Sequence, residues 1–179
     1  MIYEPREDSF LLEKAVKKYA YGKVLDMGTG SGIQAIAAAK NKNVRSITAA
    51  DINKEAIMNT LQIAMKKGIP LSILQSNLFE NIDEKFDTII FNPPYLPSDP
   101  KLKDLTLDGG KEGYELIQKF LKQAKKHLEK KGILLLLFSS LTDKNKVEEI
   151  LTKNKYKYKE VDKLKLDFEE LYIYMIQCK

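Results

Sequence analysis

The sequence has few of the residues that build disulfide or metal sites. Its 179 residues include one cysteine, Cys178, and one histidine. A single cysteine cannot form an internal disulfide, and these two residues are too few for a zinc site. We therefore expect this chain to bind no metal, and we expect Cys178 to be a buried, unreactive thiol in the last strand.

Long apolar stretches are also missing. A membrane-spanning helix needs roughly 20 apolar residues, whereas the longest candidate here, residues 133–138, has the length of a buried strand. Residues 1–7 carry charges, where a signal peptide would need an apolar stretch. These features predict a cytoplasmic protein without membrane contact.

The remaining composition is that of a globular protein. Hydrophobic residues make up 44% and charged residues 31%, and we find no repeat, low-complexity tract or flexible linker. We expect one domain over residues 1–179, with a helical lead-in at 1–20, a core at 23–140 and a C-terminal helix and strand pair at 141–179. The net charge of +5 is compatible with nucleic acid, ribosomal material or an acidic protein as partner, and it chooses none of them.

Residue periodicity predicts strands that alternate with helices. Runs typical of strands cover residues 23–27, 45–51, 71–74, 86–91, 133–138, 156–161 and 171–177. Between them, apolar residues recur at helical spacing. This alternation predicts an α/β fold with a doubly wound, mostly parallel seven-stranded sheet, in which ligands bind beyond the carboxyl ends of the strands.

The expected helix boundaries rest on capping and breaking residues. Asp8 or Ser9 can cap the first helix, Asn53 the third and Thr142 the last. Gly132 is expected to end the helix before the fifth strand. In the third helix we expect an inward stripe of Ile57, Leu61, Ala64 and Met65.

The loop after the first strand reads Asp-Met-Gly-Thr-Gly-Ser-Gly over residues 26–32 and leads directly into a helix. Its glycines, Gly28 and Gly30 among them, permit a tight turn and the close approach of a ligand, while the helix start adds free N–H donors. A nicotinamide-binding loop would have a third glycine at position 33, where Ile33 stands. The spacing and the acidic Asp26 instead resemble the first motif of class I S-adenosylmethionine-dependent methyltransferases.

Two more polar positions follow the second and third strands. The Asp51 carboxylate can accept hydrogen bonds from both hydroxyls of an adenosine ribose, in S-adenosylmethionine or NAD alike. Asn77 can accept from the adenine amino group while the Leu78 N–H meets a ring nitrogen. Class I methyltransferases more often have Asp at this place, although Asn keeps an acceptor oxygen. The alternative is that the glycines only make a turn and Asp51 caps a helix, but three linked features at successive strand ends favour a cofactor site.

The tetrapeptide Asn92-Pro93-Pro94-Tyr95 follows the fourth strand. An amide or aniline-type nitrogen is a poor nucleophile because its lone pair is delocalised. The Asn92 side-chain oxygen and the Pro93 carbonyl can accept its N–H bonds and orient the lone pair, while two prolines stiffen the loop and Tyr95 can stack on a flat substrate group. Orientation of this kind supplies several kcal/mol of barrier reduction. The alternative, an ordinary turn, is disfavoured by its position downstream of the glycine-rich loop.

Taken together, these motifs resemble the HemK-type protein-glutamine N5-methyltransferases (release-factor methyltransferases) in the short form of archaea and eukaryotes. Residues 3–12 resemble the start of that form, in which the residue matching Ser9 contacts the cofactor. Residues 107–113 resemble its Gly-Gly-x-x-Gly segment. The alternative for these two stretches is a helix start and a flexible loop. The resemblance covers residues 3–140.

The resemblance implies a Rossmann-like fold, S-adenosylmethionine as cofactor with S-adenosylhomocysteine as product, and no metal. It implies catalysis by Asn92, Pro93 and Tyr95, substrate binding by residues 92–95, and a cofactor contact at Asn92. The implied substrate is the glutamine of the Gly-Gly-Gln motif in a translation release factor. The implied partner is a small zinc-binding activator that forms a heterodimer, for which residues 45–50 are a candidate pairing strand.

Other functions stay open at this point. The same tetrapeptide occurs in enzymes that methylate adenine N6, cytosine N4 or guanine N2, and the positive charge suits a nucleic-acid amino-methyltransferase. Protein lysine methylation is a further alternative. A non-catalytic scaffold is disfavoured because the glycine-rich loop, Asp51 and residues 92–95 are all present.

Overall fold

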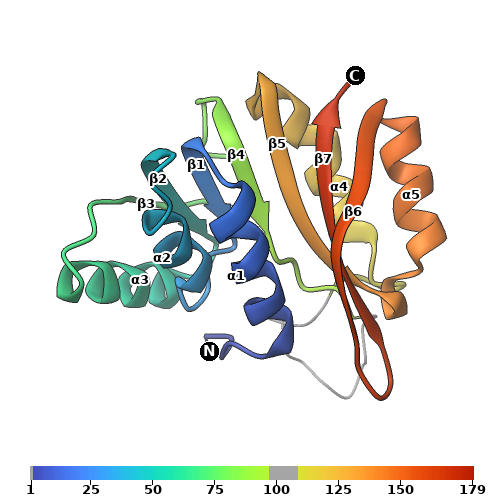
Figure 1. Ribbon diagram of the computed structural model, residues 1–179, viewed down its shortest axis with the longest axis horizontal. Helices are drawn as coiled ribbons and strands as arrows, with labels where there is room; N and C mark the ends of the chain where they lie inside the picture. Colours follow the sequence, from blue (N-terminus) through green and yellow to red (C-terminus); the bar gives the residue numbers. More distant parts are fainter. Residues whose placement is uncertain (1, 97–108) are drawn as a thin grey trace.

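The computed structural model describes residues 2–96 and 109–179, which form a seven-stranded sheet in the order β3-β2-β1-β4-β5-β7-β6 (Figure 1). The strands are β1 (Gly22–Met27), β2 (Val44–Asp51), β3 (Ser72–Gln75), β4 (Phe86–Phe91), β5 (Leu128–Ser139), β6 (Tyr156–Lys165) and β7 (Glu170–Cys178). The helices are α1 (Glu7–Tyr19), α2 (Ile33–Ala39), α3 (Lys54–Lys66), α4 (Glu115–Ala124) and α5 (Lys144–Lys153), with 3-10 turns η1 (Lys125–His127) and η2 (Ser140–Thr142).

The first five strands pair in parallel, and β7 lies antiparallel between β5 and β6. The predicted doubly wound, mostly parallel sheet is confirmed. The winding changes direction between β1 and β4, which are direct neighbours. Ligands of such sheets bind outside the carboxyl ends of the strands at this switch point, so the ends of β1 and β4, at Met27 and Phe91, mark the expected site.

Helices cover both faces of the sheet (Figure 1). On one face, α1 and α2 contribute core residues such as Leu12, Val16 and Ala38. On the other, α4 and α5 contribute residues such as Phe120 and Ile150. Strand β5 is buried from residue 132 to 139, as its apolar sequence predicts for a strand with neighbours on both edges and helices on both faces.

Two expected caps are wrong. Asp8 and Ser9 lie buried inside the first turn of α1, whose N-cap is Arg6 and has no side-chain cap bond.

The last helix is capped by Asp143, whose carboxylate accepts from the Lys146 N–H at 3.2 Å. Thr142 lies in η2 instead, and its hydroxyl donates to the Tyr95 carbonyl at 3.0 Å. The Asp8 carboxylate in turn accepts from the Asn92 side chain at 2.9 Å. Asp8 and Thr142 thus both contact residues of the 92–95 tetrapeptide.

Asn53 caps α3 as expected, with its side chain accepting from the Glu55 N–H at 2.9 Å. The inward stripe is wrong at Met65, which is 71% exposed. In its place α3 buries Thr60, which packs against the glycine-rich loop. Periodicity could not predict this because Thr60 is polar.

Gly132 does not end a helix. The helix α4 ends at Ala124, and β5 already begins at Leu128. Gly132 lies within β5, next to an irregularity in its pairing with β4, and a Cβ there would come within 3.0 Å of the Phe86 carbonyl oxygen. The glycine therefore permits close approach of two strands.

The expected pairing strand for a partner, residues 45–50, lies in β2. That strand is paired with β1 on one side and with β3 on the other, so it offers no free edge. The sheet order leaves β3 at this edge of the described structure. In the part of the chain that is described, no helix is long and apolar enough to cross a membrane.

Candidate active site

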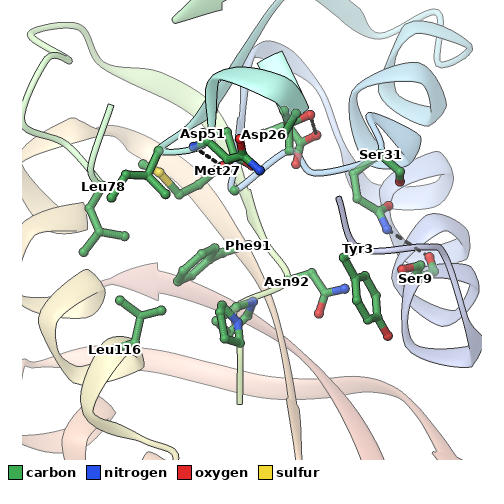
Figure 2. Close-up of a pocket in the computed structure, with 18 of the residues that line it drawn as sticks. Tyr3, Ser9, Asp26, Met27, Ser31, Asp51, Leu78, Phe91, Asn92 and Leu116 are labelled. Carbon is green, nitrogen blue, oxygen red and sulfur yellow. Dashed lines mark hydrogen bonds between the residues drawn. The ribbon is translucent and has the colours of Figure 1, made fainter. Parts of the chain in front are cut away.

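A cavity of about 760 Å³ opens at the carboxyl ends of β1, β2 and β4 (Figure 2). Almost all site residues expected from the sequence line it. They are Ser9, Asp26, Gly28, Asp51, Asn77, Leu78, Asn92, Pro93, Pro94 and Tyr95. Gly30 is not among the lining residues. The expected segment at residues 107–113 can be placed only from Gly109 onward, because residues 107 and 108 lie outside the described part.

The glycine-rich loop follows β1 and wraps one side of the cavity. Gly28 and Gly32 have φ angles of +64° and +80°, in the region that favours glycine. A Cβ on Gly32 would also lie 2.9 Å from the Thr60 Oγ1. The loop conformation and the packing of α3 against it therefore both require glycine at position 32.

Asp26 stabilises this loop through hydrogen bonds. It is 1% exposed, and its Oδ2 accepts from the Thr29 hydroxyl at 2.7 Å and from the Ala35 N–H at 3.0 Å. Burial raises the pKa of Asp26 to about 7, although both hydrogen bonds act in the opposite direction. The side chain thus joins the loop to α2, and it also lines the cavity.

Asp51 is held from two sides at the end of β2. Its Oδ2 accepts from the Gly30 N–H at 2.9 Å, and its Oδ1 accepts from the Asn53 N–H at 2.8 Å. Gly30 therefore contributes by orienting Asp51 rather than by lining the cavity. Each carboxylate oxygen keeps a further lone pair, so both can accept from a pair of ligand hydroxyls.

The turn after β3 forms another wall. Leu78 is buried with a φ angle of +50°, and its carbonyl accepts from the Ser76 hydroxyl at 2.7 Å. The Asn77 side-chain nitrogen donates to the Glu80 carboxylate at 2.8 Å. Because that bond uses the nitrogen, the Asn77 Oδ1 is the atom left to accept from a ligand.

Asn92 is bound to the start of α1. Its Nδ2 donates to the Asp8 Oδ2 at 2.9 Å, and the Tyr3 hydroxyl donates to the Asp8 Oδ1 at 3.1 Å. Among the described residues, the buried Oδ1 of Asn92 has no hydrogen-bond partner. Figure 2 shows Asn92 between Phe91 and Tyr3 at the cavity. A buried acceptor without a partner costs free energy, and a ligand N–H can satisfy it.

Gln34 repeats this arrangement on α2. Its Nε2 donates to the Ser9 carbonyl at 2.9 Å, while its buried Oε1 finds no partner within the described structure. Gln34 also lines the cavity. The cavity thus holds two buried amide oxygens, each from a side chain whose nitrogen is bound to the first turn of α1.

Tyr95 is the last residue of the tetrapeptide at residues 92–95. Its carbonyl accepts from Thr142, and burial together with the nearby Asp8 carboxylate raises the pKa of its phenol far above the usual value. The phenol therefore stays protonated at neutral pH. It can pack against a substrate and donate a hydrogen bond, and it cannot act as a phenolate base.

Sequence reasoning missed several residues of this site. Asp8 was interpreted as a helix cap, and Tyr3 and Gln34 were given no role, although all three line the cavity. The resemblance over residues 3–12 was the signal that could have found Tyr3 and Asp8. Gln34 carries no such signal, because its role depends on a contact with Ser9 across 25 residues of sequence.

The described residues, 2–96 and 109–179, contain no group of three or more His, Cys, Asp or Glu side chains that could hold a metal ion.

The fold and the cavity at its switch point define the class: this is the class I methyltransferase fold. A model of the methyltransferase small domain family matches residues 7–166, and the chain belongs to that family. The expected enzyme class, a methyltransferase, is thereby confirmed.

Among curated proteins, the chain is similar to one of Methanocaldococcus jannaschii that is provisionally named protein N5-glutamine methyltransferase. The two are 38% identical over 177 residues, which cover 96% of this chain and 89% of the relative. The release factor glutamine methyltransferase of Lactococcus lactis is 35% identical over 124 residues, or 64% of this chain and 46% of the relative. The chain thus spans about half the length of that bacterial relative. These relatives confirm the predicted resemblance to glutamine methyltransferases.

Among solved structures, the chain is similar to the E. cuniculi Mtq2–Trm112 complex, described as responsible for methylation of the eRF1 translation termination factor. The TM-score is 0.79 at 25% identity, with 99% of both chains covered. The ribosomal protein L11 methylase of Lactobacillus delbrueckii subsp. bulgaricus matches with a TM-score of 0.75 at 22% identity, over 99% of this chain and 82% of that one. The similarity to the L11 methylase, at 22% identity, supports the fold alone.

Proposed function

We propose that this chain is an S-adenosylmethionine-dependent N-methyltransferase that methylates the glutamine side-chain amide of the Gly-Gly-Gln motif in a translation release factor. The observation that carries the proposal is the partnerless, buried Asn92 Oδ1 at the cavity. An acceptor in this position suits a substrate that brings N–H bonds. The named activities of the M. jannaschii and L. lactis relatives and of the E. cuniculi complex support a glutamine amide as that substrate.

The cavity fits the cofactor by the chemistry of its walls. Asp51 presents two oriented carboxylate oxygens that suit ribose hydroxyls, and Asn77 with the Leu78 N–H suits adenine. The buried, partnerless Oε1 of Gln34 suits the ammonium group of the methionine part. Gly28 and Ser9 also line the cavity and would contact the cofactor. When bound, S-adenosylmethionine supplies an electrophilic methyl carbon on a positively charged sulfur.

The chain's own contribution to methyl transfer is orientation. The Asn92 Oδ1 and the Pro93 carbonyl accept the two N–H bonds of the substrate amide, which turns its nitrogen lone pair toward the cofactor. Tyr95 and Pro94 hold the flat amide group. With S-adenosylmethionine bound, this nitrogen would receive the methyl group in place of one amide proton, which would leave to water. Precise positioning of this kind is worth several kcal/mol of barrier.

A nucleic-acid amino group is the second candidate. The net charge of +5 favours it, and so does a relative from Serratia proteamaculans, a ribosomal RNA small subunit methyltransferase C, which is 36% identical over 49% of this chain. That match covers 25% of the relative, so it carries less weight than the near full-length likeness to the M. jannaschii protein. RNA methylation predicts binding that weakens steeply as salt rises.

We also propose that a small zinc-binding activator protein forms a heterodimer with this chain, in line with the two-protein E. cuniculi complex. An apolar residue beside the cavity, Ile52, is 64% exposed. Its carbonyl accepts from the side chain of Gln75, the last residue of the edge strand β3. The partner would cover this apolar surface and pair with β3, because β2 has no free edge.

The test is methyl transfer from labelled S-adenosylmethionine to a purified release factor, with and without a candidate activator. The control is the same factor with its Gly-Gly-Gln glutamine replaced. Label that disappears with this glutamine supports the proposed reaction. Label on RNA or on a lysine, and none on the factor when the activator is present, rejects the substrate and keeps the methyltransferase.

A further inference from the structure

The side chain of Asn92 can point into the cavity in two ways that have nearly the same shape. With Oδ1 toward the substrate it accepts an N–H bond, and with Nδ2 there it would oppose the substrate N–H with another donor. Only the first orientation suits methylation of an amide nitrogen. The free-energy difference between the two orientations is set by the group that contacts the other end of the Asn92 amide.

Asp8 is that group. Its Oδ2 accepts from the Asn92 Nδ2 at 2.9 Å. An ionised carboxylate accepts hydrogen bonds and cannot donate them, so it attracts the amide nitrogen and repels the amide oxygen. The Tyr3 hydroxyl donates to the other carboxylate oxygen at 3.1 Å, which fixes the plane of the carboxylate.

Asp8 lies at the start of α1 and is shielded from solvent. Asp8 is the second residue of α1, where free backbone N–H groups and the helix dipole stabilise negative charge. The side chain is 3% exposed, so water does not shield its interaction with Asn92. The ordinary reason for an acidic residue at this place is capping, yet the N-cap is Arg6 and no side-chain cap bond is formed.

We propose that Asp8 is a positioning residue that holds the Asn92 amide with its oxygen toward the substrate, and that Tyr3 steadies Asp8. This inference rests on the proposed function, because the orientation matters only for a substrate that donates N–H bonds. It explains why a carboxylate is buried at the start of α1, 84 residues away in sequence from the catalytic loop. It also gives α1 a part in the chemistry of the site.

The decisive variant is Asp8→Asn, which keeps the shape of the side chain and removes its charge. An amide at position 8 can donate to the Asn92 oxygen as readily as it can accept from the nitrogen, so the bias is lost. We expect kcat to fall on the order of 10-fold, with KM for S-adenosylmethionine and for the release factor each within about 2-fold. We expect a larger kcat loss in Asp8→Ala and a smaller one in Tyr3→Phe.

Glu7→Gln is the matched control. Glu7 is an exposed acid in the same turn of α1 and does not line the cavity. The Glu7→Gln substitution removes one negative charge at the helix start, as Asp8→Asn does, so it reports any effect of the helix dipole alone. We expect wild-type kinetics for Glu7→Gln. Equal losses in Asp8→Asn and Glu7→Gln, or a wild-type kcat in Asp8→Asn, would overturn the inference.

A spectroscopic readout separates this inference from the proposed function. The side-chain amide signal of Asn92 can be assigned in a nitrogen-15 spectrum by its absence from Asn92→Ala. In the wild-type chain we expect it to exchange slowly with water, and in Asp8→Asn to shift and exchange faster, while Glu7→Gln leaves it unchanged. If the wild-type chain transfers no methyl to the release factor with the activator present, the proposed function fails. An Asn92 signal that is the same in Asp8→Asn and wild type overturns the role of Asp8.

Discussion

Two carboxylates at the ends of neighbouring strands show how burial assigns different tasks to the same side chain. Asp26 is buried and accepts hydrogen bonds from Thr29 and Ala35, so it fastens the glycine-rich loop to α2. Asp51 is half-buried and lines the cavity. The first carboxylate builds the loop, and we propose that the second binds the ribose of the cofactor.

The raised pKa of Asp26 gives a prediction for stability. The folded protein holds the proton up to about pH 7, whereas the unfolded chain releases it near 3.8. Between these values the folded state binds more protons, so this group makes the free energy of unfolding fall as pH rises. Asp26→Asn cannot titrate. We expect its stability relative to wild type to increase between pH 4 and pH 7, by up to about 4 kcal/mol, in urea denaturation. A difference in the free energy of unfolding between Asp26→Asn and wild type that stays constant across this range would contradict the prediction.

At Asn92 the prediction concerns rate. Replacing Asn92 by Ala removes the acceptor oxygen, and we expect kcat to fall by at least about 100-fold, the usual cost of losing one oriented hydrogen bond in a transition state. The affinity for S-adenosylmethionine, measured by calorimetry, should change by less than about 3-fold, because Asp51, Asn77 and Gln34 are untouched. Equal loss of affinity and rate would mean that Asn92 mainly binds the cofactor.

At the scale of elements, the glycine-rich loop and α3 depend on each other. The Thr60 side chain fills the space that a Cβ on Gly32 would occupy, and its hydroxyl is 3.4 Å from the Gly30 carbonyl oxygen. The contact joins the start of α2 to the middle of α3 and sets the distance between the glycine-rich loop and that helix. A change on either side therefore changes the shape of the cavity next to the glycine-rich loop.

Gly32→Ala should destabilise the fold through two separable effects. The left-handed backbone costs about 1–2 kcal/mol for a residue with a Cβ, and the clash with Thr60 costs a further ~1–3 kcal/mol. Gly32→Ala combined with Thr60→Ala should remove the clash and keep the backbone cost. Urea denaturation of both single variants and the double variant would measure this coupling, and strictly additive losses would show that the two residues do not compete for space.

Sequence reasoning recovered what depends on local pattern and on strand ends. The spacing of apolar residues predicted the strands. Asn53 predicted the start of α3, and the glycine-rich loop predicted the end of β1 and the start of α2, because these signals act within a few residues. The Asp8 and Thr142 caps were wrong because both side chains bond to groups far away in sequence, Asn92 and Tyr95. The roles assigned to the cavity residues stay predictions, as does the division into one domain.

At the scale of the whole molecule, the two edges of the sheet differ. The edge at β3 is a strand of four residues beside the exposed Ile52 and the cavity, while the edge at β6 belongs to a ten-residue strand rich in lysine. Charged side chains on an edge strand discourage pairing with another chain. The β3 edge is therefore the one we assign to the proposed partner.

Ile52→Asp should weaken binding of the activator at least about 10-fold, because it places a charge in an apolar contact. The control is Phe168→Asp. Phe168 is 94% exposed between β6 and β7, away from β3 in the sheet order. We expect no change in affinity there. Binding of the purified activator, measured by calorimetry, distinguishes the two, and a loss confined to Phe168→Asp would move the interface to the opposite end of the sheet.

The insertion of β7 between β5 and β6 has a consequence for biosynthesis. The most apolar strand, β5, receives its second neighbour only when residues 170–178 have left the ribosome, because β7 supplies that edge. Until then a nascent chain carries an unpaired, strongly hydrophobic strand edge of the kind that aggregates. Ribosome-bound chains stopped after α5 should therefore bind chaperones more strongly than chains stopped after β7.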